Sequence, residues 1–167
     1  LTSSSCHYGF SDYIDASKDE LTKFVDSCIK GALALNHSYI TWPWMAPEQR
    51  TVETFERLPE LLNTIGEQVK HAGLGFAYHN HDFEFHTYGD NIGFDMILNG
   101  TDPALVKLQL DLYWAVHSAQ KTPKELIAKA PERFVMWHIK DMDKITRDYS
   151  ELGNGSIDYS EMIPALD

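Results

Sequence analysis

Hydrophobic residues recur at helical spacing in two long stretches of the chain. The first stretch carries its apolar positions at Leu21, Phe24, Val25, Cys28, Ile29, Ala32 and Leu33. Ser17, with Glu20 three residues later, forms a capping box before it. The second stretch carries Leu58, Leu61, Leu62, Ile65 and Val69. Both are predicted helices, and we expect Pro59 to open the main body of the second and Gly73 to cap its end.

Short apolar and β-branched segments alternate with these helices. The predicted strands are residues 2–7, 38–42, 74–79, 105–111 and 134–139. A short helix at 94–98 and a helix opened by Thr122 and Pro123 separate the later strands. Such alternation predicts an α/β fold with parallel strands and helices packed outside, here as one domain over residues 1–167. In folds of this class the chemistry gathers at the carboxyl ends of the strands.

Composition and charge narrow the classes of partner. The chain has 14 Lys and Arg against 25 Asp and Glu, a formal charge of -11, which opposes binding to a nucleic-acid backbone. A run of about 18 apolar residues, as a membrane span needs, is missing, and so is a signal-peptide pattern in the first residues. The two cysteines, Cys6 and Cys28, do not suggest a disulfide framework. We therefore expect a cytoplasmic protein with no nucleic-acid or membrane partner, and a homo-oligomer stays open.

Polar side chains stand where the predicted strands end. His7, His79 with His81, Asp111 and His138 occupy four of these ends. A single histidine at such a place is usually structural, but parallel strands deliver their last side chains to one rim. His79, Asp111 and His138 can therefore converge. Two imidazoles and a carboxylate form a ligand set for a divalent metal ion, and they favour Mn, Co, Zn or Fe over Mg.

The segment 78–85, Tyr-His-Asn-His-Asp-Phe-Glu-Phe, is denser in polar groups than a buried strand tolerates without a purpose. Alternation along the chain places His79 and His81 on the same side. Asp82 and Glu84 are equally well explained as surface charges of a solvated loop.

Four ordered motifs carry a family resemblance. They are residues 78–85, 110–114 (Leu-Asp-Leu-Tyr-Trp), 138–142 (His-Ile-Lys-Asp-Met) and 153–159 (Gly-Asn-Gly-Ser-Ile-Asp-Tyr). With them the chain resembles the sugar phosphate isomerase/epimerase family of the xylose-isomerase-like barrel superfamily. The resemblance implies an incomplete (β/α)8 TIM barrel, of which this chain supplies about strands three to seven. The parent protein is then expected to be longer by roughly 100 residues.

The same resemblance implies a metal centre and its chemistry. It makes His79, Asp111 and His138 the metal ligands, with a fourth, acidic ligand on an eighth strand beyond Asp167. Many isomerases of the superfamily have Glu where His79 stands, so the proton must here be moved by another group. The implied function is a metal-dependent sugar or sugar-phosphate isomerase or epimerase acting through an enediolate-type intermediate.

The remaining candidates are residues that would touch the substrate. His81 and Lys140 are the candidates for proton movement or substrate contact, His7 for a substrate hydroxyl, and Trp44 or Trp114 for an apolar wall against a sugar ring. Each has a structural explanation too, because barrel tryptophans commonly serve packing and a lysine pairs readily with a neighbouring acid.

Two other functions stay open. The first is a keto-sugar or keto-inositol dehydratase or lyase of the same fold. The second is a non-catalytic sugar-binding or scaffold protein that keeps the fold without the full ligand set. Separately, the structural explanation of Lys140 is that it only pairs with Asp141. The DNA-repair branch of the superfamily is opposed by the charge of -11.

Overall fold

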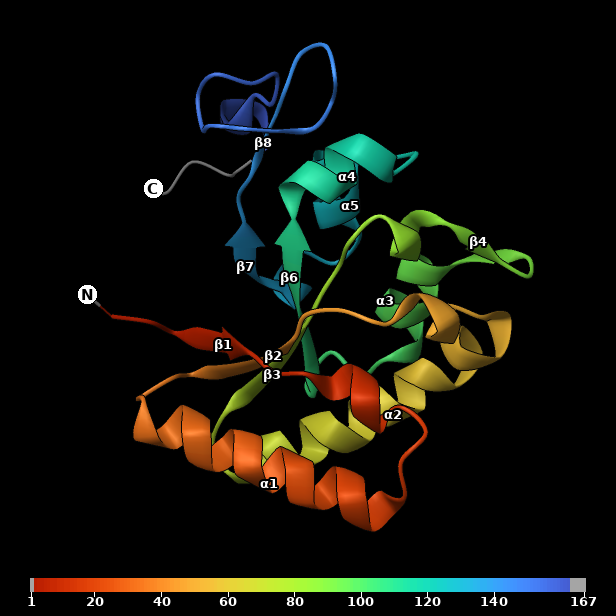
Figure 1. Ribbon diagram of the computed structural model, residues 1–167, viewed down its shortest axis with the longest axis vertical. Coiled ribbons are helices and arrows are strands. Elements are labelled where there is room, and N and C mark those ends of the chain that lie inside the picture. The colour runs from red at the N-terminus through yellow and green to blue at the C-terminus, as the bar shows by residue number, and fades with distance from the viewer. Residues whose placement is uncertain (1, 163–167) are drawn as a thin grey trace.

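Five parallel strands form the centre of the protein. The computed structural model describes residues 2–162 of the chain, and Figure 1 shows its architecture. The strands are β1 (Ser5–His7), β2 (Tyr39–Trp42), β3 (Gly75–His79), β6 (Val106–Asp111) and β7 (Phe134–His138). They lie in the order β1-β2-β3-β6-β7, and each neighbouring pair is parallel. All five strands predicted from the sequence are therefore present, the first of them shortened at its beginning.

The sheet is curled into a half-barrel. His7 on β1 and Gln109 on β6 are separated by two strands, yet Nε2 of His7 lies 2.8 Å from Oε1 of Gln109. Such a contact across the concave face requires strong curvature. This agrees with the barrel type that the sequence predicts, in partial form.

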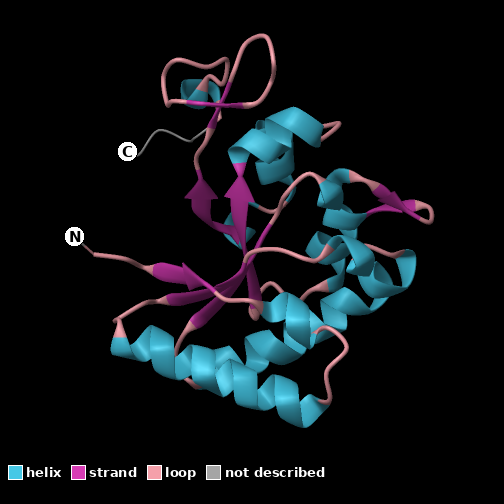
Figure 2. Cartoon of the chain, in the orientation of Figure 1, coloured by secondary structure: helices cyan, strands magenta, loops and turns pink. Residues whose placement is uncertain are grey.

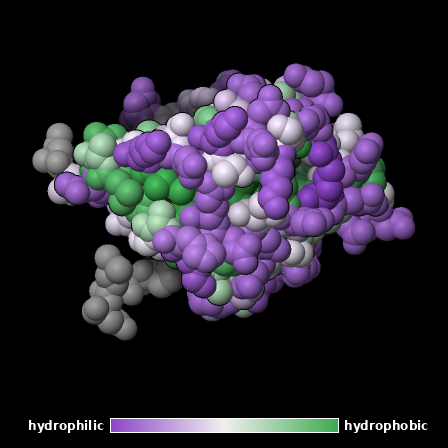
Figure 3. Space-filling view, turned by 90° about the horizontal axis from the view of Figure 1, so that it is seen from below, coloured by the Kyte–Doolittle hydropathy of each residue, from purple (hydrophilic) through white to green (hydrophobic). Residues whose placement is uncertain are grey.

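Helices cover the convex face of the sheet. They are α1 (Lys18–Ala34), α2 (Val52–His71), α3 (Gly93–Gly100), α4 (Leu112–Ser118) and α5 (Pro123–Lys129). Figure 2 shows α1 and α2 side by side against the lower part of the sheet, whereas α4 follows the upper end of β6. The surface seen from below in Figure 3 is mostly hydrophilic, with hydrophobic residues gathered on one side. The layer between sheet and helices is mostly apolar, with buried Val25, Ile40, Leu62, Ile65, Phe76 and Val106.

The helix ends follow the local rules of the sequence with one exception. Ser17 and Glu20 form the predicted capping box of α1. Pro59 does not open the second helix, because α2 already begins at Val52 with Thr51 as its N-cap. The proline lies inside the helix, where its ring faces Gly100 so closely that a Cβ there would lie 2.8 Å from the ring. Tertiary packing therefore carries the helix across a residue that would break an isolated one.

Small elements complete the chain. The hairpin strands are β4 (Thr87–Tyr88) with β5 (Asn91–Ile92), and β8 (Asp141–Met142) with β9 (Tyr149–Ser150). Short 3-10 helices are η1 (Phe10–Tyr13), η2 (Pro47–Gln49), η3 (Phe83–Phe85), η4 (Pro131–Arg133) and η5 (Tyr159–Glu161). Among the described residues, none of the helices combines the length and the apolar character that a membrane crossing demands.

Candidate metal centre

Three strand ends meet at one point of the half-barrel. β3 ends at His79, β6 at Asp111 and β7 at His138, and Asp111 lies directly opposite His138 in the sheet register. The structure thus brings together the three residues that the sequence predicts as metal ligands. One ligand atom from each lies within 4.8 Å of the others.

The three side chains point their polar atoms at one another. Nε2 of His79 lies 3.2 Å from Oδ2 of Asp111 and 2.7 Å from Nδ1 of His138. The same His138 atom is 3.4 Å from Oδ2 of Asp111. His79 and Asp111 are 1% and 0% exposed, whereas His138 is partly buried. The cluster is therefore buried at His79 and Asp111 and partly accessible at His138, as a catalytic metal site with an open position would need to be.

The hydrogen bond on the far side of His79 fixes which nitrogen is free. Nδ1 of His79 lies 3.0 Å from the carbonyl oxygen of Pro43. A carbonyl oxygen only accepts hydrogen bonds, so Nδ1 carries a proton, and with a cation bound Nε2 would offer its lone pair to the ion. That lone pair and the Asp111 carboxylate are two electron-pair donors turned toward one point. The donor set therefore fits a divalent cation, with Pro43 as the outer partner that orients the first imidazole.

Asp111 is held in place by the fold on its other side. Its Oδ1 accepts a hydrogen bond from the backbone N–H of Trp114 at 3.1 Å, as the N-cap of α4. Its Oδ2 faces His79 and accepts from Nζ of Lys140 at 2.6 Å. Burial works to raise the pKa of Asp111, but the contacts with His79 and Lys140 lower it more. Asp111 is therefore an ionised carboxylate, as a metal ligand must be.

Burial favours the neutral form of three imidazoles around the centre, those of His7, His81 and His138. The His7 ring lies 5.2 Å from that of His79, and the His81 ring lies 4.7 Å from it, nearly perpendicular. Burial, with smaller contributions from neighbouring charges, lowers the pKa of His81 and of His138 to about 4. A neutral imidazole can bind a metal ion or accept a proton, so both predicted functions are chemically available to these side chains.

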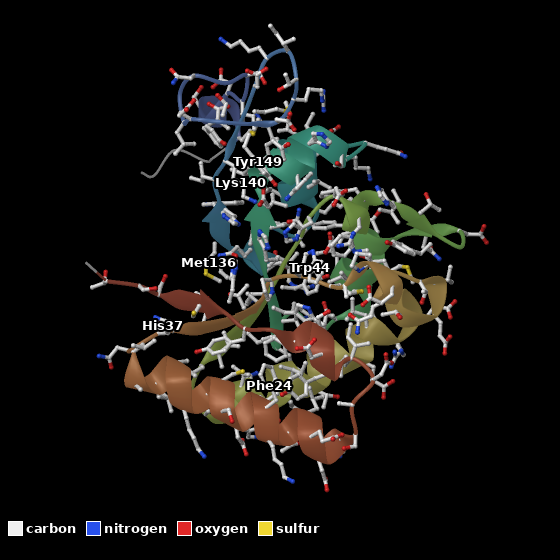
Figure 4. The ribbon with its side chains drawn as sticks, in the orientation of Figure 1. Phe24, His37, Trp44, Met136, Lys140 and Tyr149 are labelled. Atoms are coloured by element: carbon white, nitrogen blue, oxygen red, sulfur yellow. The ribbon has the colours of Figure 1, made fainter. Side chains whose placement is uncertain are left out.

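Lys140 and two aromatic rings form the outer wall of the centre. Nζ of Lys140 lies 5.9 Å from the Trp114 ring and 5.5 Å from the Tyr149 ring. Figure 4 shows Lys140 and Tyr149 next to each other beyond the end of β7, at the upper end of the sheet. The alternative in which Lys140 only pairs with Asp141 is wrong, because Lys140 reaches across to Asp111 instead. Tyr149 was missed by sequence reasoning, since an exposed tyrosine on the two-residue strand β9 carries no distinguishing pattern.

Asp141 organises the loop that carries Tyr149. Its carboxylate accepts hydrogen bonds from four backbone amides, those of Met142, Gly153, Gly155 and Ile157, at 2.8 to 3.2 Å. Glycine is needed at position 155 because a Cβ there would collide with Oδ1 of Asp141. Tyr159 closes the loop by donating to the carbonyl of Lys140.

The two predicted sugar-facing tryptophans lie in different surroundings. Trp114 packs between both hydrophobic clusters, its ring 6.0 Å from that of His81. Trp44 follows Pro43, is 41% exposed, and lies 5.4 Å from the guanidinium of Arg50. Trp114 therefore borders the centre directly, and Trp44 stands at its edge, one residue beyond the carbonyl that orients His79.

Glu84 is where the sequence interpretation fails. The surface-charge explanation is wrong for this residue, because its side chain is 0% exposed. The chain turns back in η3 after Asp82 and carries Glu84 under the strand end. The polar density of segment 78–85 was the signal that could have revealed it.

Comparison with known proteins gives the family. The family model described as "Xylose isomerase-like TIM barrel" matches residues 1–167. The chain belongs to this family. Comparison with curated proteins gave no match.

Several solved structures share the fold over nearly the whole chain. A sugar phosphate isomerase/epimerase from Parabacteroides distasonis is 26% identical, with a TM-score of 0.78 over 95% of this chain and 57% of that one. The IOLI protein, solved with a zinc atom, is 15% identical, with a TM-score of 0.71 over 93% of this chain and 59% of that one. A probable 3-DHS dehydratase, AsbF from Bacillus anthracis, is 12% identical, with a TM-score of 0.63 over 94% and 62%. The chain thus spans about three fifths of the length of these structures.

Proposed function

We propose that the protein is a metal-dependent isomerase or epimerase that acts on a sugar or sugar phosphate through an enediolate-type intermediate. The observation that carries the proposal is the cluster of His79, Asp111 and His138 at the carboxyl ends of three parallel strands. The likeness to a sugar phosphate isomerase/epimerase at 26% identity supports the same class of reaction.

The three clustered residues would hold the metal ion. A mixture of two imidazoles and one carboxylate favours Mn, Co, Zn or Fe over Mg. When bound there, the ion would supply positive charge that holds two substrate oxygens and stabilises the negative charge developing on them. Asp111 would be the anionic ligand, and the proton of His79 would stay on Nδ1, bonded to Pro43.

The other residues around the centre would bind the substrate and move its proton. His81 is the proposed base, since burial favours its neutral form and its ring lies beside that of His79. Lys140 would contact a substrate oxygen, and His7 would hold a hydroxyl. Trp114, with Trp44 at the edge, would form the apolar wall against the sugar carbons.

The wider biochemical setting follows from charge and composition. The net charge of -11 suits a small-molecule substrate and opposes a nucleic acid. Cys6 and Cys28 are both free, in keeping with a reducing compartment such as the cytoplasm.

A dehydratase of the same fold is the second candidate. A probable dehydratase has a similar fold. The initial removal of a proton beside a carbonyl is common to both reactions. The two activities differ in the next step, since a dehydratase expels water and an isomerase returns the proton to carbon.

Proton exchange into the substrate separates the candidates. The purified protein, loaded with Mn or Co, is incubated in D2O with a panel of ketoses, aldoses and their phosphates, and carbon-bound hydrogen is followed by NMR. An isomerase or epimerase incorporates deuterium beside the carbonyl and forms an isomeric sugar. A dehydratase forms a product that has lost one molecule of water. Binding without exchange would contradict both enzyme proposals and leave a sugar-binding barrel. His138→Ala, which removes one proposed ligand, is the control and is expected to be inactive.

A further inference from the structure

The loop after β3 contains a fully buried carboxyl group that the proposed chemistry does not use. Oε2 of Glu84 accepts a hydrogen bond from the backbone N–H of His81 at 2.7 Å. Oε1 accepts from the Tyr78 hydroxyl at 2.8 Å. The carboxyl therefore ties the interior of β3 to the main chain of the residue proposed as the base.

Asn80 holds the same main chain from the other side. Its Nδ2 donates to the carbonyl of His81 at 3.3 Å, and its Oδ1 accepts from the backbone N–H of Asp111 at 3.0 Å. Both polar groups of the His81 backbone are thus fixed by buried side chains, and one of these also reaches the proposed metal ligand on the next strand. The imidazole of His81 is left to face the centre, against His79 on one side and stacked on Phe83 on the other.

Packing alone gives no reason for a carboxyl at position 84. The side chain is fully buried beside the Tyr78 hydroxyl, and burial raises its pKa to about 8. Removing such a group from water is unfavourable, and an apolar residue of similar volume would fill the space without that penalty. What an apolar residue cannot do is accept the hydrogen bond from His81.

We propose that Glu84 is a positioning residue: its buried carboxyl fixes the main chain of His81 and thereby holds the His81 imidazole at the metal centre. The inference rests on the proposed function, in which His81 moves the substrate proton. Glu84 itself has no described contact with His79, Asp111 or His138, so its effect on the reaction passes through His81.

Three variants test this role. Glu84→Met keeps the volume and removes the acceptor, Glu84→Gln keeps an acceptor oxygen for the His81 N–H, and Asp82→Asn changes charge two residues away at a side chain that makes no capping hydrogen bond. Amide hydrogen exchange at His81, kcat and the Kd for Mn or Co are measured for each. Glu84→Met is expected to lose protection of the His81 amide and to lower kcat about 100-fold, the effect of misplacing a catalytic group by about 1 Å. Its metal Kd should stay at the wild-type value, and Glu84→Gln and Asp82→Asn should resemble the wild type in all three measurements.

A further variant separates positioning from stability. Tyr78→Phe removes the other hydrogen bond of Glu84 and leaves the bond to His81 in place. It should lower the melting temperature without lowering kcat. If Tyr78→Phe and Glu84→Met lost kcat in proportion to their loss of stability, Glu84 would be a structural residue only. Should Glu84→Met not fold, Glu84→Asp, one methylene shorter, takes its place with the same expected direction of change.

The outcomes also distinguish this proposal from the proposed function. If Glu84→Met lost protection at His81 but kept wild-type kcat, the positioning role would be overturned and the enzyme proposal would stand. If the wild type turned over no sugar or sugar phosphate, the enzyme proposal would fail. Amide hydrogen exchange would then still decide whether Glu84 fixes the main chain of His81. Unchanged protection at His81 in Glu84→Met would overturn the inference in either case.

Discussion

Asp111 and Glu84 are two carboxyl groups that the fold removes completely from water around the same strand ends. Asp111 faces His79 and Lys140, and these contacts keep its pKa below the usual value despite burial. Glu84 faces a tyrosine hydroxyl and a backbone amide, neither of them charged, and burial raises its pKa to about 8. Equal burial therefore gives an anion in one place and a group that is mostly protonated at neutral pH in the other.

The difference shows how one rim of the sheet supports two kinds of site. A metal centre needs a carboxylate that stays ionised, and the contacts of Asp111 with His79 and Lys140 favour that form. A positioning group needs only a fixed acceptor oxygen, which a protonated or an ionised carboxyl can supply. Substitutions in the proposed metal centre should therefore affect metal binding, whereas substitutions of Glu84 should affect the position of His81 and the stability of the fold.

The largest expected effect separates ligand from base within segment 78–85. His79→Ala is expected to lose the metal ion together with activity, because it removes the nitrogen that faces Asp111. His81→Ala should keep the metal and lower turnover by about 100- to 10,000-fold, the usual effect of removing a proton-transfer group. Metal content by atomic spectroscopy and kcat on the same samples check both. Full turnover by His81→Ala would assign proton transfer to another group.

The burial of the Glu84 carboxyl group should make the stability of the protein depend on pH. The folded protein keeps this proton up to about pH 8, whereas an unfolded glutamate loses it near its ordinary pKa of 4.5. Between these values the folded state binds more protons, so the free energy of unfolding contributed by Glu84 falls as the pH rises. The free energy of unfolding of the wild type, taken relative to that of Glu84→Gln, should fall by about 3 kcal/mol between pH 5 and pH 8. Urea unfolding at several pH values measures it, and parallel curves for the two proteins would contradict the raised pKa.

Lys140 tests the metal-centre side of the comparison. Its ammonium is bonded to Oδ2 of Asp111, the same oxygen that faces His79, and so competes with a metal ion for it. Lys140→Met should bind Mn or Co about 10- to 100-fold more tightly, the equivalent of one hydrogen bond to a charged group. It should also lower turnover if Lys140 contacts the substrate. Lys107→Met, the same change at a lysine of β6 that bonds to the Glu132 carbonyl instead, is the control. Equal metal affinity in all three proteins would show that Lys140 does not compete.

The smallest effect is expected beside a third buried carboxylate, that of Asp141, when Gly155 is replaced by alanine. Asp141 is satisfied by backbone amides alone, and Gly155 approaches it too closely for a side chain. Gly155→Ala should lower the free energy of unfolding by about 1 to 3 kcal/mol through overpacking. Gly9→Ala, where a Cβ would meet nothing within 4 Å, is the matched control. Chemical denaturation measures both, and equal stability would mean that the loop adjusts without loss.

Local patterns were enough to predict most of the fold. The helical spacing and the capping box at Ser17 predicted α1, and the alternation of strands and helices predicted the parallel sheet. The failure at Pro59 has a physical reason, since its tolerance depends on packing against Gly100, which lies far away in the sequence. Local propensity cannot include such a contact.

The residues of the candidate site also fall into those that local patterns predict and those that they do not. His79, Asp111 and His138 were found because parallel strands deliver their last residues to one rim, a rule that needs no coordinates. The burial of Glu84, the carbonyl of Pro43 and the approach of Lys140 to Asp111 all depend on how loops turn after the strands end. Loop geometry is set by contacts between distant residues, which the sequence pattern does not contain.

The metal titration of the purified protein tests the central claim most directly. Isothermal titration with Mn, Co or Zn should show one tight site per chain, which His79→Ala, Asp111→Ala and His138→Ala each weaken strongly. His7→Ala and His81→Ala, whose imidazoles lie beside the cluster without forming it, should keep that site. A wild-type protein that binds none of these ions, or three ligand variants that bind as the wild type does, would contradict the proposed metal centre.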